Sequence, residues 1–510
     1  MPQNLTMKRN ILLICTTFCF FIGFAQQPVF NWGELRGKPE TPAEVQVLGY
    51  TAEGYYIISK KEPSAAQAQS IIRSAFSPVI TVEYINNTGV RIYNRDVSTG
   101  RSDDYVNTVY FNDMLYVISA LYNKEAGKNV LTAKAVDADG SESKPVEIGS
   151  MAAAKMSQRG LFYVATSPDG SKLLVLSQPE YVKDQNEKIG LTLFTGKFTQ
   201  SWAGDQAFPY AWSKSVDNRP FVSNNGIAFL LKQISAKGSD DTWSIFSSST
   251  GKALKEHKLG FNGDKKISSV VQAFSPEGDF TIAGYYKEEG GKIRISMGDK
   301  ANGSFLYRVD AAGDQLKTGI INPFSKRSDI IARSILFNES SSILLAERYT
   351  ISDRAAPRTA STPQTNETMF ARDYSYNGMD IYIDGFDAAG KPVYTTAIDK
   401  NNSSKNDLGY WLSFFGTMVK GKLQLVFMDN FSRYDDKKIS INTPNIIVYT
   451  SVDPVTGKAE KSQPVSNPGS VGGKGGDSYM RPDVFLKTGD GQYIIRSENS
   501  SSYRMGTMVY

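Results

Sequence analysis

A short turn recurs along this chain, always between two segments that have the composition of β-strands. It begins with Asp and ends with Gly, and its copies are Asp137–Gly140, Asp310–Gly313, Asp387–Gly390 and Asp453–Gly457. A second turn alternates with it, at Ser167–Gly170, Ser275–Gly278 and Thr488–Gly491. Asp and Gly supply the left-handed backbone geometry of tight hairpins. Two turn types recurring through 510 residues predict one repeated sheet unit, which is the signature of a β-propeller.

The strand pattern predicts eight repeats of a four-stranded unit, with seven as the alternative count. We name the strands of each unit a to d. The a–b pairs are the clearest: Val45–Tyr50 with Tyr55–Ser59, Thr108–Phe111 with Leu115–Leu121, Leu161–Thr166 with Lys172–Ser177, Phe221–Ser223 with Ile227–Lys232, Ser269–Phe274 with Phe280–Tyr286, Ser334–Phe337 with Ile343–Tyr349, Phe414–Val419 with Leu423–Met428, and Val484–Lys487 with Tyr493–Ser497. The b strands are the most apolar, as expected of strands buried on both faces between neighbouring units.

The last repeat lacks a fourth strand in the sequence that follows it. Its third strand is predicted at Met505–Tyr510, while Pro28–Trp32 near the N-terminus is a spare strand. We expect these two segments to pair and close the ring, because closure removes the open sheet edges. The predicted fold is therefore all-β, a single propeller domain over residues 26–510.

The N-terminus has the pattern of an export signal. Lys8 and Arg9 precede an apolar run from Ile11 to Phe24, and Ala25 ends the segment at a small residue. The run is shorter than the about 20 residues that a membrane span requires. We expect residues 1–25 to be a signal peptide cleaved after Ala25. The mature chain would then be periplasmic or secreted, without a transmembrane segment.

Residue usage excludes several kinds of chemistry. Both cysteines, Cys15 and Cys19, lie inside the predicted signal, and the one histidine, His257, is predicted on the surface of an outer strand. Zinc sites and Ser–His or Cys–His catalysis need such residues in the mature chain, so no metal or cofactor is expected. Lys and Arg outnumber Asp and Glu only by 57 to 52, which is no argument for nucleic-acid binding.

The long connections indicate where a ligand would bind. The a–b and c–d turns are short, whereas b–c and d–a connections such as Ser352–Gly378 and Gln200–Pro220 are long and varied. Both long kinds emerge on the same face of a propeller. Variable loops on a rigid scaffold commonly carry binding sites, so we expect the long-loop face to be the binding surface. The alternative is that these loops are tolerated insertions.

Four arginines stand just before or at the start of predicted a strands: Arg159, Arg219, Arg333 and Arg481. The a strands line the central channel and begin on the long-loop face. We therefore predict that these side chains surround the channel mouth and attract a carboxylate, a phosphate or an acidic peptide. The alternative is that each arginine pairs with an acidic neighbour between blades, because repeated positions commonly serve the packing of the repeat.

Aromatic residues are concentrated in the same long connections. The candidates for ligand contact are Trp202, Tyr210, Trp212 and Trp411. Tyr and Trp favour surfaces that bind protein or sugar. The alternative is that they pack as plugs over the loops.

One repeat has a recognisable motif. The segment Ser167–Ser177, Ser-Pro-Asp-Gly followed by an apolar strand, resembles the repeat of WD40-like propellers in bacterial envelope proteins, the TolB-like group. Ser275–Ala283 is a looser second copy. The resemblance implies an envelope propeller that works through protein contacts, and it provides no catalytic residues to transfer.

Two functions remain open from the sequence. The favoured one is an exported, non-catalytic propeller that binds an envelope protein or an acidic or glycan ligand through its long-loop face. The alternative is an exported propeller enzyme, a lyase or glycosidase acting on polysaccharide, whose mouth arginines grip a uronate or sialate. Carboxyl groups with perturbed pKa values at the channel mouth would favour the enzyme.

Overall fold

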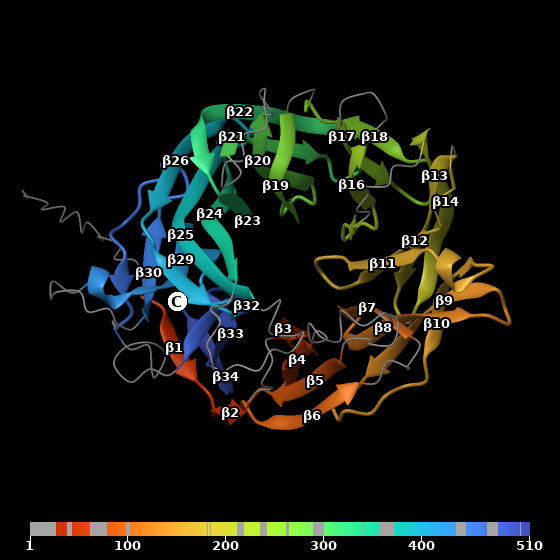
Figure 1. Ribbon diagram of the computed structural model, residues 1–510, viewed down its shortest axis with the longest axis horizontal. Helices are drawn as coiled ribbons and strands as arrows, with labels where there is room; N and C mark the ends of the chain where they lie inside the picture. Colours follow the sequence, from red (N-terminus) through yellow and green to blue (C-terminus); the bar gives the residue numbers. More distant parts are fainter. Residues whose placement is uncertain are drawn as a thin grey trace, which may run out of the picture.

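The computed structural model describes residues 27–37, 43–61, 79–97, 103–180, 182–183, 185–211, 219–234, 242–261, 265–288, 300–339, 341–355, 372–434, 445–466, 478–499 and 501–510. The predicted signal peptide and Trp212 lie outside these residues. The described residues form eight antiparallel blades around a ring (Figure 1). The predicted all-β propeller and the larger of the two blade counts are both confirmed.

In each blade the strands follow one another from the centre of the ring outward. Blade 1 contains β3 (Ala43–Leu48), β4 (Gly54–Lys61), β5 (Val79–Asn86) and β6 (Arg91–Val97); blade 2 contains β7 (Asp103–Phe111), β8 (Met114–Asn123), β9 (Lys128–Val136) and β10 (Val146–Ala152). Blade 3 contains β11 (Leu161–Thr166), β12 (Lys172–Gln178), β13 (Asn186–Thr195) and β14 (Thr199–Ala211); blade 4 contains β15 (Pro220–Val222), β16 (Ala228–Ile234), β17 (Thr242–Ser248) and β18 (Lys255–Lys258).

The second half of the ring repeats this arrangement. Blade 5 contains β19 (Lys265–Phe274), β20 (Phe280–Glu288), β21 (Lys300–Val309) and β22 (Leu316–Ser328); blade 6 contains β23 (Ile330–Asn338), β24 (Ser341–Ala355), β25 (Arg372–Asp387), β26 (Pro392–Ile398) and the added β27 (Asn402–Lys405). Blade 7 contains β28 (Phe414–Val419), β29 (Lys422–Asn430), β30 (Asn445–Val452) and β31 (Gln463–Pro464). Blade 8 contains β32 (Tyr479–Gly489), β33 (Gln492–Glu498), β34 (Ser502–Val509), β1 (Val29–Trp32) and β2 (Arg36–Gly37).

The second strand of each blade is the core of the fold. All eight predicted a–b pairs are present, with ends shifted by a few residues. In β29, Leu423 through Asp429 are all buried, because neighbouring blades cover both faces of the strand. The outer strand β26 instead alternates between exposed and half-buried residues along most of its length, since one face meets solvent.

The ring closes through its two termini, as predicted. β1 pairs antiparallel with β34, with Val29 opposite Val509 and Trp32 opposite Gly506. Phe30, on the inner side of β1, belongs to the same buried cluster as Met508. The N-terminal strand is thus the outer strand of the last blade (Figure 1).

The recurring turn also holds neighbouring blades together. At five junctions a side chain of one blade donates a hydrogen bond to a carbonyl in the c–d turn of the next blade, an arrangement we call the interblade clasp. The bonds are Arg36 Nη2 to Gly89 O (2.7 Å), Tyr93 Oη to Asp137 O (3.1 Å), Gln206 Nε2 to Gly251 O (3.1 Å), Ser247 Oγ to Gly313 O (2.5 Å), and Tyr394 Oη to Pro454 O (2.9 Å).

The glycine of the turn is required for this contact. Gly457 has a φ of +71°, and a Cβ added there would lie 2.3 Å from the Tyr394 ring. A side chain at this position would therefore strain the backbone and push the two blades apart. The repeat of Asp and Gly in the sequence has two causes, hairpin geometry and the close approach of the preceding blade.

His257 is part of one clasp, and its predicted position on the surface is wrong. It lies on the outer strand β18 as expected, but its side chain is buried. Its Nε2 lies 3.0 Å from Ser247 Oγ and 3.1 Å from Gly313 O. Burial lowers the pKa of the imidazole below its ordinary 6.5, although the Gly313 carbonyl acts in the opposite direction.

Closure by β1 can be tested with two substitutions in the same strand. Phe30 is 6% exposed and Val29 is 58% exposed. Phe30→Ala should lower the free energy of unfolding by about 3–5 kcal/mol, because it leaves a cavity against β34. Val29→Ala should change it by less than about 0.5 kcal/mol. Urea unfolding midpoints measure both, and equal effects of the two substitutions would contradict closure by this strand.

The buried histidine predicts a pH dependence of stability. The folded-state pKa of His257 is depressed, so the unfolded chain takes up a proton more readily than the fold does. This contribution is fully present above pH 6.5 and is lost as the pH falls from there toward the folded-state pKa. His257→Gln, which cannot be protonated, should show a shallower loss of unfolding free energy across this window. Identical pH profiles for the two proteins would show that His257 is not coupled to folding.

Candidate functional site

The predicted mouth arginines stand at the inner strands, and carboxylates accompany three of them. Arg159 Nη1 lies 2.7 Å from Asp104 Oδ2 of the preceding blade. Arg333 Nη2 lies 2.7 Å from Glu347 Oε2 of its own blade. Arg219 precedes β15 and is exposed. The alternative of pairing between blades thus describes Arg159, whereas Arg333 and Arg481 pair within their own blades. Ligand binding by the four arginines stays a prediction.

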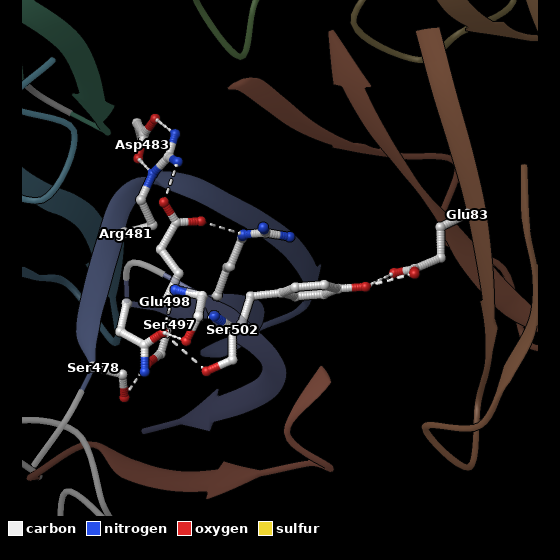
Figure 2. Close-up of polar contacts among 11 residues, drawn as sticks. Glu83, Ser478, Arg481, Asp483, Ser497, Glu498 and Ser502 are labelled. Carbon is white, nitrogen blue, oxygen red and sulfur yellow. Dashed lines mark hydrogen bonds and ion pairs between the residues drawn. The ribbon is translucent and has the colours of Figure 1, made fainter. Parts of the chain in front are cut away.

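Arg481 is the most enclosed of the four. Its side chain is on β32, and the residue is only 1% exposed. Nε and Nη2 donate to the two oxygens of Asp483 at 2.8 and 2.5 Å, and Nη1 donates to Glu498 Oε1 at 3.0 Å (Figure 2). The guanidinium also lies 4.1 Å from the centre of the Tyr410 ring. These partners occupy Arg481, so it presents little open charge to a ligand.

Polar contacts extend from Glu498 across the seam between blade 8 and blade 1. Arg496 Nε donates to Glu498 Oε2 at 2.9 Å, and its guanidinium lies 4.0 Å from the centre of the Tyr503 ring. The Tyr503 hydroxyl then reaches Glu83 of β5, at 2.6 and 2.5 Å from its two oxygens (Figure 2). Burial, with the Glu83 charge, raises the pKa of Tyr503 to about 12. The hydroxyl therefore keeps the proton that it donates.

This seam network, from Asp483 to Glu83, was not found from the sequence. One signal was available, because Arg496 and Glu498 place charges in a b strand that is otherwise apolar. Their partners could not be identified in the same way, since Tyr503 and Glu83 are 420 residues apart. Only closure of the ring brings them together.

The candidate aromatic residues are packed into the fold. The expected loop Gln200–Pro220 is wrong over its first half, because β14 extends to Ala211 as an outer strand. Trp202 and Tyr210 therefore lie on a strand, and both pack against the buried cluster around Phe208. Trp411 is buried, and its ring stacks on that of Tyr479 with centres 4.5 Å apart. Their contacts match the plug alternative, and a role in ligand binding stays a prediction.

The long-loop face has a rigid projection instead. β24 and β25 continue as paired strands beyond the blade, and β27 adds a third strand to them. We call residues 349–355, 372–378 and 402–409 the arm. The predicted loop Ser352–Gly378 is therefore wrong at both ends, which are strands. Three large apolar side chains of the arm are exposed: Ile351 (59%), Tyr374 (41%) and Leu408 (48%).

Buried polar contacts fix the base of the arm. Glu347 of β24 accepts hydrogen bonds from Arg333 Nη2 at 2.7 Å, Lys400 Nζ at 2.6 Å and Ser413 Oγ at 3.1 Å. Asp407 accepts from the backbone N of Gly409 at 2.9 Å and from Trp411 Nε1 at 2.8 Å. The strands and turn that present Ile351, Tyr374 and Leu408 are thereby held in one arrangement.

The described ranges contain neither a metal-binding cluster nor a membrane-spanning helix. No group of three or more His, Cys, Asp or Glu residues there could hold a metal ion. No helix in the same part of the chain is long and apolar enough to cross a membrane.

Comparisons with known proteins show no family for this chain. The chain matches no protein-family model and no curated protein. It is similar to the Dos1 propeller (TM-score 0.40, 10% identity, 94% of each chain covered). It is also similar to the WD40 domain of SCAP from fission yeast (TM-score 0.34, 8% identity, 95% of this chain and 98% of that chain) and to prolyl oligopeptidase B from Galerina marginata (TM-score 0.37, 11% identity, 90% and 55%). These likenesses are distant, so the TolB-like resemblance stays a prediction.

Arg481 is buried and Arg159 is partly exposed, so we expect their substitution to have different effects on stability. Arg481→Met removes the cation of Asp483 and one of the two arginines that contact the largely buried Glu498, and it should lower the free energy of unfolding by about 3 kcal/mol. Arg159→Met breaks a partly exposed pair and should cost about 1 kcal/mol or less. Chemical unfolding of both variants makes the comparison. A stable Arg481→Met protein beside a strongly destabilised Arg159→Met protein would reverse this assignment.

Proposed function

We propose that this protein is an exported, non-catalytic binding propeller that docks an envelope protein on its long-loop face, with the arm as the main contact. The observation that carries the proposal is the exposure of Ile351, Tyr374 and Leu408 on one rigid projection. Exposed apolar side chains gathered on one element mark interaction surfaces.

The geometry of the arm supports a shared contact surface. Ile351 is opposite Tyr376, and Asp353 is opposite Tyr374, so Ile351 and Tyr374 are diagonal neighbours on the same face of the paired strands. Leu408 follows in the turn after β27, next to Asn406, whose Oδ1 accepts a hydrogen bond from the backbone N of Tyr374 at 2.9 Å. Tyrosine, present here as Tyr374, is one of the residue types enriched in protein-binding hot spots.

Preorganisation supports the same conclusion. The arm consists of paired strands, and its base is tied to Glu347 and Asp407. A partner that docks there has little chain to order, which lowers the cost of association.

One observation favours the polysaccharide-acting alternative. Asp104, at the start of β7, has a pKa raised by burial and by neighbouring Asp103, although Arg159 lowers it. A raised carboxyl pKa is typical of a general acid. The pairing of Arg333 and Arg481 weighs against this alternative. Carboxylates of the protein already hold these two arginines, which the alternative requires for binding an acidic sugar.

Affinity capture with matched variants tests the proposal. The mature chain from residue 26 is used to capture partners from an envelope extract, and the recovered proteins are quantified by mass spectrometry. Ile351→Asp should reduce recovery of a stoichiometric partner by at least about tenfold. Val393→Asp is the control, since Val393 is similarly exposed on the outer strand β26 of the same blade. Equal recovery with both variants would exclude the arm as the docking surface.

A further inference from the structure

A cavity of about 430 Å³ lies beside the closing strand, between blade 8 and blade 1. Its walls come from the segment after β1, from the b and c strands of blade 8, and from the a–b and c–d turns of blade 1. Its size is within the range of about 300–1,000 Å³ that small-molecule sites occupy. It lies at tight turns, where the sequence predicted no binding.

The walls of this seam cavity are held by hydrogen bonds. Arg36, which is buried, donates from Nη2 to Gly89 O at 2.7 Å and so joins the closing segment to the turn of blade 1. Within that turn, Asn86 Oδ1 accepts from the backbone N of Thr88 at 3.1 Å and of Val90 at 2.8 Å. The guanidinium of Arg504 lies 5.0 Å from the centre of the Trp32 ring and helps to position it.

The lining combines aromatic rings with neutral polar groups. The rings are those of Trp32 and Tyr50, with the buried Tyr55 and Tyr493 behind the surface, and the amides are those of Asn31, Asn86, Asn87 and Gln492. Asn86 Oδ1 and Asn87 Nδ2 already bond within the turns. An amide side chain such as Asn31 or Gln492 carries both donors and an acceptor, which suits the adjacent hydroxyl groups of a sugar. Aromatic side chains offer an apolar face together with a polar edge, and this suits the C–H face of a pyranose.

The charge of the lining restricts the ligand further. Among the described lining residues, Glu34 and Arg36 carry charge, and their charges offset each other. Charged groups strengthen the hydrogen bonds that hold phosphate or carboxylate groups, and the described lining has no excess of cationic side chains. A neutral ligand with many hydroxyl groups fits the lining better.

We propose that the seam cavity binds a neutral saccharide, of the size of a mono- or disaccharide, between the closing strand and the first blade. Such a ligand contacts both sides of the ring closure at once. It therefore binds the closed ring better than the open chain and stabilises the fold by mass action. This site is separate from the arm, so it stands or falls independently of the docking proposal.

Saturation-transfer NMR and calorimetry on the mature chain test whether a neutral saccharide binds. The probes are glucose, galactose, N-acetylglucosamine and the β-1,4-linked disaccharides of glucose and N-acetylglucosamine, with glucuronic acid as the charged comparison. At least one neutral probe should bind at millimolar concentration and raise the unfolding temperature. Binding of glucuronic acid alone, or of none of the probes, would overturn the proposal.

Matched variants locate the site. Tyr50 lines the cavity and is 45% exposed, whereas Tyr374 on the arm is 41% exposed. Tyr50→Ala and Gln492→Ala should each weaken binding of the neutral probe by at least about tenfold, while Tyr374→Ala leaves it unchanged. Both cavity residues are open to solvent, so the variants should fold. Binding that is unaffected by the two cavity substitutions would place the saccharide elsewhere and overturn the assignment.

Discussion

The pairing of β1 with β34 is the contact on which the rest of the ring depends. A four-stranded blade cannot bury its second strand alone, because both faces of that strand need a neighbouring blade. The last blade obtains its outer strand from the other end of the chain, with Val29 opposite Val509. Only then does blade 8 face blade 1, and the seam network and the seam cavity both lie at that junction. Closure therefore positions the proposed saccharide site as well as the fold.

Some buried polar groups pair between blades. Buried polar pairs join neighbours at several junctions: Lys232 with Glu187 at 2.7 Å, Tyr285 with Asp384 at 2.7 Å, and Tyr503 with Glu83 at 2.6 Å. Such pairs add little net stability compared with an apolar core. Separating the two partners is costly, however, because each is left buried without its partner. The pairs therefore disfavour incorrect alignment of neighbouring blades, which resemble one another. Arg159 pairs across a junction in the same way, whereas Arg333 and Arg481 pair within their own blades. Because carboxylates hold these arginines, the search for a binding surface moves to exposed apolar groups.

The strands could be predicted because local chemistry marks them. An apolar run such as Leu173–Ser177, directly after the Ser167–Gly170 turn, has few structures open to it, and it is found as a b strand. The errors arose where a neighbour decides the outcome. Residues 199–211 have loop-like composition but pair with β13, and His257 has a polar side chain but is covered by the turn that contains Gly313. Neither partner can be recognised from nearby sequence.

The sequence by itself determined the strand order within the blades and the closing strand, and it favoured eight blades over seven, because turn chemistry and apolar periodicity act over a few residues. Tertiary structure decided which polar side chains meet. Tyr503 and Glu83, or Gln492 and Asn87, come from opposite ends of the chain, and they share one seam because the ring closes between them. Hydrogen bonds and cavities depend on distances of a few tenths of an ångström across blades. That precision comes from packing of the whole ring, which no local pattern encodes.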